Sequence, residues 1–293
     1  MIPPASPAPE AVPAIPEPPR APHEHAQLQP ESVIMSKPVI DRSVVTLSDP
    51  SKPATIEIDL LHGEVIVKGY EGKEIIVEAR SDGKIITDKN QDHKTNERAK
   101  GMKLIKKANA DLQIEEEKNV VSVNVESWKA TVDLILQVPY SSSIKVDGQI
   151  NGGTRIDNIS GEIEIEVVNG HLLLNNITGP VVASTVNGNI EVYFKKVNPK
   201  KPMSFDSLNG DIDITLPADT RATLLMESQQ GDIYSDFDIT LGSHPKKTVE
   251  EKDEEGGGIH ISVDEGSQAA INGGGVEIQI ETFNGDILIR KSK

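Results

Sequence analysis

Carboxylate side chains recur at alternate positions in several short stretches of the sequence. Glu162, Glu164 and Glu166 alternate with isoleucine and valine, and comparable positions of other stretches hold Glu191, Asp211, Asp213 and Asp286. Two carboxylates roughly 5–9 Å apart can cleave a glycosidic bond, one as the acid and the other as the base or nucleophile. The pattern therefore raises the hypothesis of a carbohydrate-active enzyme on a β-helix.

The same pattern has a simpler explanation. Successive side chains of a β-strand point to opposite faces, so a strand with one buried face carries polar side chains at every other position. The carboxylates follow this rule, and only four Phe, four Tyr and one Trp could serve as sugar-binding platforms. We therefore favour a solvated strand face, expect no enzyme and assign no catalytic residue.

The sequence also predicts no metal site and no cofactor. It has no cysteine, and its seven histidines lack the spacings that are typical of zinc sites. Stacked carboxylates about 4.8 Å apart would repel one another and could attract Ca²⁺ weakly. The glycine- and aspartate-rich nonapeptide of Ca²⁺-binding β-rolls is absent, however. The histidines are His23, His25, His62, His93, His171, His244 and His260.

Charge and composition argue against nucleic-acid binding and against a membrane-spanning segment. The net charge is −16, with 46 acidic and 30 basic residues, which disfavours nucleic acid because phosphate binding needs a basic surface. No run of 18 apolar residues is present, so no membrane-spanning segment is expected.

Residues 1–38 hold eleven of the nineteen prolines and predict a disordered linker or tether. Residues 39–293 are predicted to be a single β-repeat domain.

The compartment depends on how the N-terminus is read. Met1 is followed by a proline-rich stretch that lacks the basic and apolar regions of a signal peptide. Either the protein is cytosolic, or an export signal was removed from this chain. We favour the second alternative, because a tether of this composition often follows a removed signal or lipid anchor. The expected location is the periplasm or the cell surface.

A nine-residue repeat organises the middle of the chain. Gly161, Gly170, Gly179 and Gly188 are nine residues apart, and positions −2, +2 and +4 from each are apolar. Gly210 and Gly285 fit the same template, and Gly231 heads a degenerate copy. A period of two within each copy predicts a strand with one buried face, and a fixed repeat predicts a repeated supersecondary unit.

Asparagine precedes the glycine in six places, at 151, 169, 187, 209, 272 and 284. Asn-Gly adopts positive φ at low cost and marks tight turns, as in antiparallel hairpins. Uniform spacing also fits a solenoid with about 18 residues per coil, which we favour. The predicted turn residues are Gly161, Gly170, Gly179, Gly188, Gly210, Gly231, Gly285, Asn169, Asn187, Asn209 and Asn284.

The flanking sequence predicts further strands. They are expected at 55–61, 64–68, 74–80, 112–117, 120–126 and 132–138. Between them lies a charged insert, 81–102, with one short helix around 91–100. Residues 216–237 look like a further coil, and 242–258 like a polar acidic loop that interrupts the array. The basic C-terminal strand is expected to cap the array against end-to-end strand addition.

Three copies of one unit carry a resemblance to a known family: TVNGNIEV, SLNGDIDI and TFNGDILI. The landmarks VDLILQVPYSSSIKV, ITLPADTRATLLMES and GGGVEIQIETFNGDILIRK occur in the same order around them. Over residues 54–293 the chain resembles a large bacterial family of β-strand-repeat proteins, proposed to be adhesins, whose function is unknown. The resemblance implies an all-β solenoid or sandwich-like stack, reached after export, and it supplies no catalytic residues.

The leading hypothesis is therefore a non-enzymatic, extracytoplasmic β-solenoid that presents a surface for adhesion, interaction or envelope scaffolding. Its expected partner is a protein or glycan at the cell envelope. The carbohydrate-active enzyme remains an alternative, and a cytosolic scaffold that assembles through its solenoid ends is another.

Overall fold

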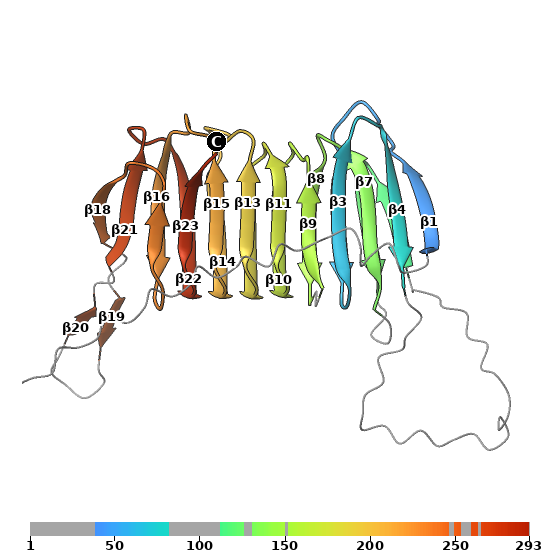
Figure 1. Cartoon of the computed structure of the whole chain (residues 1–293). Coiled ribbons are helices and arrows are strands. Elements are labelled where there is room, and N and C mark those ends of the chain that lie inside the picture. The colour runs from blue at the N-terminus through green and yellow to red at the C-terminus, as the bar shows by residue number, and fades with distance from the viewer. Residues whose placement is uncertain are drawn as a thin grey trace, which may run out of the picture.

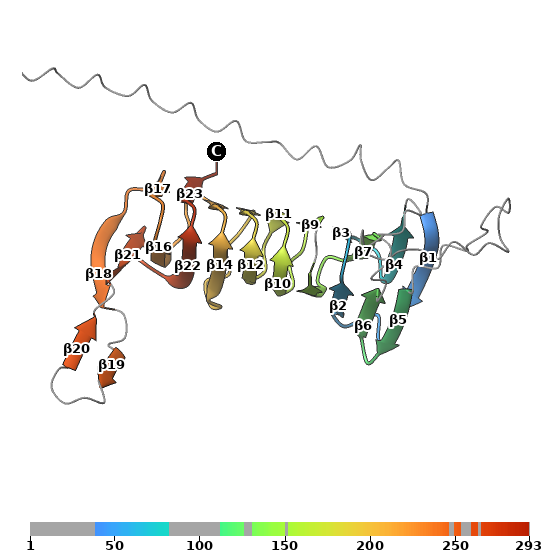
Figure 2. The same cartoon turned by 90° about the horizontal axis from the view of Figure 1, so that it is seen from below.

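The computed structural model describes residues 39–81, 112–125, 131–149, 152–245, 249–252, 259–262 and 265–292. Every regular element in these ranges is a β-strand. The strands form a ten-stranded sheet, an eleven-stranded sheet and a separate pair, and the two large sheets lie face to face (Figures 1 and 2). The described residues include no helix that could cross a membrane. The predicted helix near 91–100 and the linker 1–38 lie outside them.

The ten-stranded sheet is called sheet A, and the eleven-stranded sheet is called sheet B. In spatial order, sheet A consists of β1 (Val39–Thr46), β4 (Glu74–Arg80), β7 (Asp133–Pro139), β3 (Glu64–Tyr70), β9 (Gly153–Asp157), β11 (Leu172–Ile177), β13 (Ile190–Phe194), β15 (Ile212–Leu216), β23 (Ile287–Lys291) and β17 (Ile233–Ser235). Sheet B consists of β18 (Thr240–Pro245), β21 (Glu265–Ile271), β16 (Ala222–Ser228), β22 (Val276–Asn284), β14 (Met203–Asn209), β12 (Val181–Asn187), β10 (Ile163–Asn169), β8 (Ser143–Gly148), β2 (Thr55–Leu60), β6 (Val120–Val125) and β5 (Leu112–Glu117). β19 (Val249–Lys252) and β20 (Ile259–Ser262) form the separate pair. The six strands predicted before the array all occur, within two residues of their expected ends.

Each coil places one strand in sheet B and the next strand in sheet A. Ile163 of β10 lies opposite Val181 of β12, and Leu172 of β11 lies opposite Ile190 of β13, both in parallel pairs. The partners are 18 residues apart, and the pairing is parallel, so the predicted solenoid is confirmed and the hairpin alternative is excluded. Residues 216–237, predicted to form a further coil, supply β16 and β17.

The stacking order departs from the sequence order near both ends. The coil formed by β22 and β23 lies between the β14–β15 coil and the β16–β17 coil, and the β2–β3 coil lies between β6–β7 and β8–β9. The prediction that the C-terminal strand caps the array is therefore wrong, because β23 pairs with β15 on one side and β17 on the other.

Antiparallel strands terminate the stack at both ends of sheet B and at the β1 end of sheet A, whereas the short parallel strand β17 is the other edge of sheet A. β4 and β5 pair antiparallel with β7 and β6, and β1 pairs with β4 at the same end. At the other end β21 pairs antiparallel with β16, and β18 with β21. A further parallel coil cannot continue the repeat in register beyond such a strand. The acidic loop predicted at 242–258 is wrong in part, since β18 reaches Pro245 and β19 occupies Val249–Lys252.

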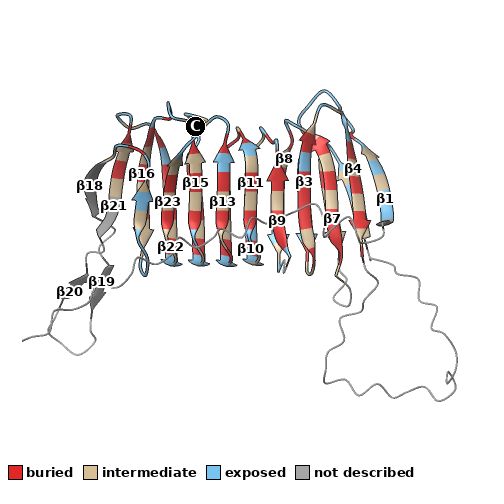
Figure 3. Ribbon diagram, in the orientation of Figure 1, coloured by how far each residue is buried: buried red, intermediate tan, exposed pale blue. Residues whose placement is uncertain are grey.

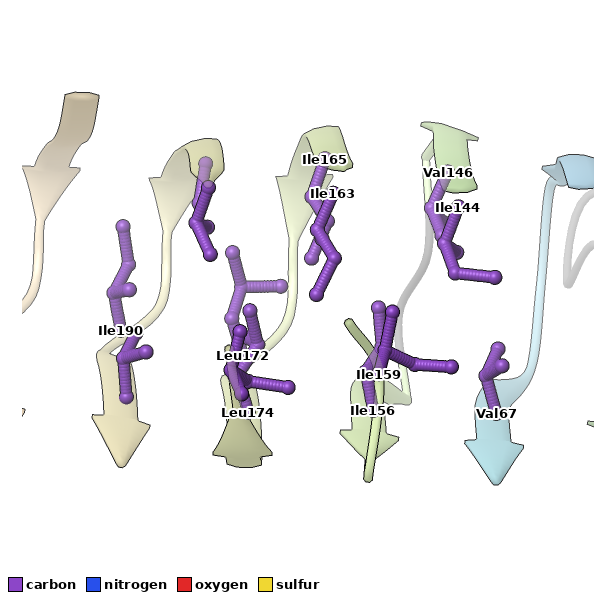
Figure 4. Close-up of a cluster of buried hydrophobic side chains, with 14 of the residues drawn as sticks. Val67, Ile144, Val146, Ile156, Ile159, Ile163, Ile165, Leu172, Leu174 and Ile190 are labelled. Carbon is purple, nitrogen blue, oxygen red and sulfur yellow. The ribbon is translucent and has the colours of Figure 1, made fainter. Parts of the chain in front are cut away.

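The core is a set of aliphatic ladders between the two sheets. Figure 4 shows Ile163 and Ile165 of sheet B facing Leu172 and Leu174 of sheet A, and all four are at most 1% exposed. Burial alternates along the strands (Figure 3). Positions +2 and +4 are buried after all the repeat glycines, Gly161, Gly170, Gly179, Gly188, Gly210 and Gly285, except in the degenerate Gly231 copy. Aliphatic β-branched side chains suit this pleated, closely stacked surface.

Position −2 of the repeat does not behave as predicted. It is buried before Gly161 and Gly179, at Ile159 and Ile177, but exposed before the glycines of the four stacked Asn-Gly turns, Gly170, Gly188, Gly210 and Gly285. At those turns position −3 points inward instead. The reason is that Asn-Gly turns follow directly on a sheet B strand, whose alternation continues up to the asparagine. The exposed residues are Val168, Val186, Leu208 and Phe283.

Candidate functional site

The Asn-Gly turns stack along one edge of the solenoid, and their glycines are closely packed. A Cβ atom on Gly188 would overlap the carbonyl oxygen of Gly170, and one on Gly210 would overlap that of Gly188. Positive φ was the expected reason for glycine, and Gly170 has it, with φ of 129°. At Gly188 and Gly210 glycine is required for another reason, because the backbone of the preceding coil lies too close for a Cβ atom.

The remaining predicted glycines also lie where backbones meet. Gly285 and Gly231 continue the same edge, because a Cβ atom on each would overlap the carbonyl oxygen of Gly210 and Gly285, respectively. Gly161 and Gly179 lie at the opposite edge, where a Cβ atom on Gly179 would overlap the carbonyl oxygen of Gly161. The structure thus divides the predicted turn residues between two edges.

The four predicted asparagines form a ladder along the Asn-Gly edge. The Nδ2 atom of Asn187 donates to Oδ1 of Asn169 at 2.9 Å, and Asn209 donates to Asn187 at 2.9 Å. Asn284 donates to Asn209 at 2.7 Å. The two central residues, Asn187 and Asn209, each donate one bond and accept one. We call this set the asparagine ladder.

Hydroxyl groups reinforce the edge from the inside. Ser207 Oγ donates to the carbonyl oxygen of Gly188 at 3.1 Å, and Thr282 Oγ1 to that of Gly210 at 3.0 Å. Both side chains occupy position −3 and are buried. A buried hydroxyl that finds a hydrogen-bond acceptor avoids the cost of desolvation. The edge is therefore tied by side chains on both sides of the backbone.

Two of the carboxylates that suggested catalysis also serve the turns. Asp211 Oδ1 accepts a bond from the backbone N–H of Asp286 at 2.8 Å, and Asp286 Oδ1 accepts one from that of Asp232 at 2.9 Å. Asn189 and His171 play the same part in the preceding coils. These side chains stabilise the stacking of successive turns.

The other candidate carboxylates are distributed over both sheets. Glu164 pairs with Lys145 at 3.0 Å, and Glu162 with Lys201 at 2.7 Å. Asp213 on sheet A accepts two bonds from Nε of Arg290, at 2.8 and 2.9 Å. The structure does not bring these carboxylates together into one site. Within the described part of the chain, no group of three or more His, Cys, Asp or Glu side chains could hold a metal ion.

A small charged cluster surrounds Tyr193 on the outward face of sheet A. Burial raises the pKa of the Tyr193 phenol, and the negative charges of Glu191 and Asp213 raise it further. The Arg290 guanidinium acts in the opposite direction. Tyr193 is 41% exposed, so the cluster presents one aromatic side chain to solvent.

The outward face of sheet B carries the most contiguous apolar surface. Val168, Val186, Leu208 and Phe283 precede the asparagines of four adjacent strands and are 38–47% exposed. We call them the edge row. Together with Val182, they account for five of the nine exposed large hydrophobic side chains among the described residues. Sequence reasoning assigned the edge row to the core, although the change from Ser-Gly or Thr-Gly to Asn-Gly marked the different turn.

Carboxylates run parallel to the edge row, two residues further back along β10, β14 and β22, and Ser184 takes that position on β12. Glu166 lies opposite Ser184, which lies opposite Asp206. Glu281 lies opposite both Asp206 and Glu227. We call Glu166, Asp206, Glu281 and Glu227 the acidic row.

A groove of about 300 Å³ lies between the edge row and the acidic row. It crosses β12, β14, β22 and β16, which are neighbours in sheet B. Three carboxylates and no lysine or arginine occur among the described residues that line it. Its lining consists of Ser184, Thr185, Val186, Asp206, Ser207, Leu208, Glu227, Gln229, Glu281, Thr282 and Phe283.

Comparison with known proteins identifies related sequences and folds. The family model described as Toastrack DUF4097 matches residues 105–290. No curated protein matches the chain. A crystal structure of a Clostridium sporogenes ATCC 15579 protein, whose name proposes a role in cell adhesion, is 10% identical with a TM-score of 0.41 and covers 86% of this chain and 99% of its own. A second, from Bacteroides fragilis NCTC 9343, is named as a proposed adhesin; it is 12% identical with a TM-score of 0.30 and covers 86% of this chain and 96% of its own.

Proposed function

The chain belongs to the Toastrack DUF4097 family, and we propose that it is a non-enzymatic, adhesin-like binding protein whose binding surface is the outward face of sheet B. The observation that supports this proposal is the edge row beside its groove. Contiguous exposed apolar side chains rimmed by polar residues are typical of interaction sites. The other described strand faces expose large apolar side chains one at a time.

The contacts of the carboxylates support a binding protein over a glycosidase. Asp211 and Asp286 accept backbone bonds that stabilise the stacked turns, and Asp213 is held by Arg290. A catalytic pair would instead have to flank a bound glycosidic bond. The proposal therefore assigns these side chains to the scaffold.

The proposal extends to the arrangement of the whole chain. Residues 39–293 act as one β-repeat domain that presents the surface, and residues 1–38 act as a tether. The protein works outside the cytoplasm, where its partner is a protein or a glycan of the envelope. Two continuous sheets that share one aliphatic core support the single repeat domain.

An attachment assay tests this function. Beads coated with the full chain are offered to surfaces coated with a panel of proteins and polysaccharides, and bound beads are counted under flow. A variant that combines Leu208→Asp and Phe283→Asp places charges in the edge row. We expect attachment of the parent to at least one surface and a loss of about tenfold or more in the variant, as for substitution of interface anchors.

The matched control is Tyr193→Asp, which introduces a charge at a similarly exposed side chain on sheet A. Circular dichroism establishes that all three proteins contain the same β-structure. The proposal fails if the parent attaches to no surface, or if the control loses attachment as fully as the edge-row variant does.

A further inference from the structure

We infer that Asn284 is a site of spontaneous deamidation, in which the backbone nitrogen of Gly285 converts the asparagine amide to a carboxylate. The asparagine ladder contains four Asn-Gly pairs at equivalent turns, each preceded by a residue of the edge row. The structure protects three of these pairs and leaves the fourth open. The reaction does not depend on the proposed binding function, although its product lies beside Phe283 of the edge row.

The chemistry needs only the chain and water. The Gly285 nitrogen loses its proton and attacks Cγ of Asn284, so that a bond forms between these atoms while the bond from Cγ to Nδ2 breaks. Nδ2 leaves as ammonia, and a cyclic imide remains. Water then opens the imide at either of its carbonyl groups, which yields aspartate or isoaspartate at position 284. Glycine favours the attack because it has no side chain to crowd the nitrogen.

A hydrogen bond from the glycine N–H opposes this attack, and three of the four pairs have one. In each of them the N–H donates to the asparagine carbonyl oxygen of the next coil. The bonds run from Gly170 to Asn187 at 3.0 Å, from Gly188 to Asn209 at 3.0 Å and from Gly210 to Asn284 at 2.9 Å. The nitrogen of each of these glycines is therefore engaged with its neighbour.

The Gly285 N–H has no such acceptor among the described residues. The next coil on this side begins with β16, whose turn lacks the Asn-Gly pair. Its Gln229 and Gln230 instead donate their own N–H groups to the carbonyl oxygens of Thr282 and Phe283, at 3.2 and 2.9 Å. Gly285 is only half-buried, so water and hydroxide can reach its nitrogen.

The Asn284 side chain is also held at only one of its atoms. Nδ2 donates to Asn209 at 2.7 Å, whereas Oδ1 accepts no bond within the described part of the chain. Asn187 and Asn209 are held at both amide atoms. Asn169 is held at one, but the N–H of its glycine is engaged. Within the ladder, Asn284 alone combines an open glycine nitrogen with a side chain held by a single bond.

The number of bonds that must open predicts the order of the rates. A net hydrogen bond of typical strength slows the reaction about fivefold. We therefore expect Asn284 to deamidate about fivefold faster than Asn169, and about 25-fold faster than Asn187 and Asn209. Asn272 is a further comparison, because its Nδ2 donates to two carbonyl oxygens, at 3.1 and 2.8 Å. It should be about fivefold slower than Asn284.

The product changes both the ladder and the edge row. A carboxylate at position 284 cannot donate to Oδ1 of Asn209, so the terminal bond of the ladder is lost. It also places a negative charge next to Phe283, which is 38% exposed. Isoaspartate additionally lengthens the backbone by one carbon at a turn where Gly285 packs against Gly210.

Peptide mapping by mass spectrometry tests the inference. The full chain is incubated at mildly alkaline pH, samples are digested under acidic conditions, and the mass gain of amide-to-acid conversion is followed at each Asn-Gly pair. We expect the conversion at Asn284 to lead in the folded chain. The control is the same chain unfolded in urea, where the sites should react at similar rates because each asparagine is followed by glycine.

Two variants test the role of the ladder bond. Asn209→Ala removes the acceptor of Asn284 Nδ2 and should speed deamidation at Asn284 about fivefold. Its matched control is Asn175→Ala, which removes a bond of 2.9 Å to Asp157 on sheet A and should leave that rate unchanged. Circular dichroism establishes that both variants are folded. Asn284→Asp carries the product charge from the start and should unfold at a lower urea concentration than the parent.

Equal rates at the five described pairs in the folded chain, or a slower rate at Asn284 than at Asn187, would overturn the inference. An equal effect of Asn209→Ala and Asn175→Ala on the rate at Asn284 would also overturn it. If the parent attaches to no surface while Asn284 still reacts first, the proposed function fails and the deamidation site stands.

Discussion

Replacing Asn187 by alanine removes two hydrogen bonds from the asparagine ladder. One is donated to Asn169 and the other is accepted from Asn209, both at 2.9 Å. A net intramolecular hydrogen bond contributes about 1 kcal/mol, so the variant should lose about 2 kcal/mol of unfolding free energy. Asn284→Ala removes only the bond to Asn209 and should lose about 1 kcal/mol. Both side chains are exposed at the same turn position, so the difference isolates the additional bond.

A double variant sharpens the test. Asn187→Ala and Asn209→Ala each remove two bonds, but they share the one between them. The double variant therefore removes three bonds, and its loss should be about 1 kcal/mol smaller than the sum of the single losses.

Urea unfolding followed by circular dichroism at the β-sheet minimum measures the parent, the three single variants and the double variant. Extrapolation to water gives each free energy of unfolding, and similar slopes show that the same surface is exposed. Equal losses for Asn187→Ala and Asn284→Ala would refute the ladder as a source of stability. Strict additivity in the double variant would refute the direct contact between Asn187 and Asn209.

Three further predictions concern other parts of the fold. Hydrogen bonds from Ser51 and the charge of Lys52 lower the pKa of Asp49 to about 2. The stability that the ionised Asp49 contributes is therefore present above the ordinary aspartate pKa and is lost as pH falls toward 2. An NMR titration should show the Asp49 midpoint at about 2, and Ser51→Ala should raise that midpoint. Leu174→Ala removes a fully buried ladder side chain and should cost about 2–5 kcal/mol in urea unfolding, and a loss below about 1 kcal/mol would contradict the close packing. Gly188→Ala forces a methyl group against the Gly170 carbonyl and should lower the thermal midpoint, whereas an unchanged midpoint would show that the stacked turns can separate.

Much of the coil could be predicted because one rule governs it. Alternation places positions +2 and +4 inward, and Ile212 and Ile214 obey it as fully as Ile163 and Ile165 do. The rule breaks where the chain turns, since a strand that continues to the asparagine keeps alternating and turns position −2 outward. Sequence reasoning treated every glycine as the same turn, so it placed Leu208 and its counterparts in the core.

The stacking order could not be predicted for a different reason. Each copy of the repeat offers the same aliphatic template, so a coil can stack on any other with similar burial. The β22–β23 coil lies next to β14–β15, 75 residues earlier in the chain by register, because Ile212 pairs with Ile287. Local sequence carries no signal for such a choice. The groove depends on this choice, since it joins Leu208 and Phe283 on adjacent strands.

In-register stacking also has an electrostatic consequence, because each strand position lies opposite the same position of the next coil. Parallel pairing places Glu281 directly opposite Asp206 and Glu227, and like charges across neighbouring strands are destabilising by about 0.2–1 kcal/mol. The same arrangement recurs elsewhere on sheet B, where Asp147 lies opposite both Glu166 and Asp59. Other positions of the stack avoid it, because Ser184 separates Glu166 from Asp206, and Lys145 lies opposite both Glu164 and Glu57.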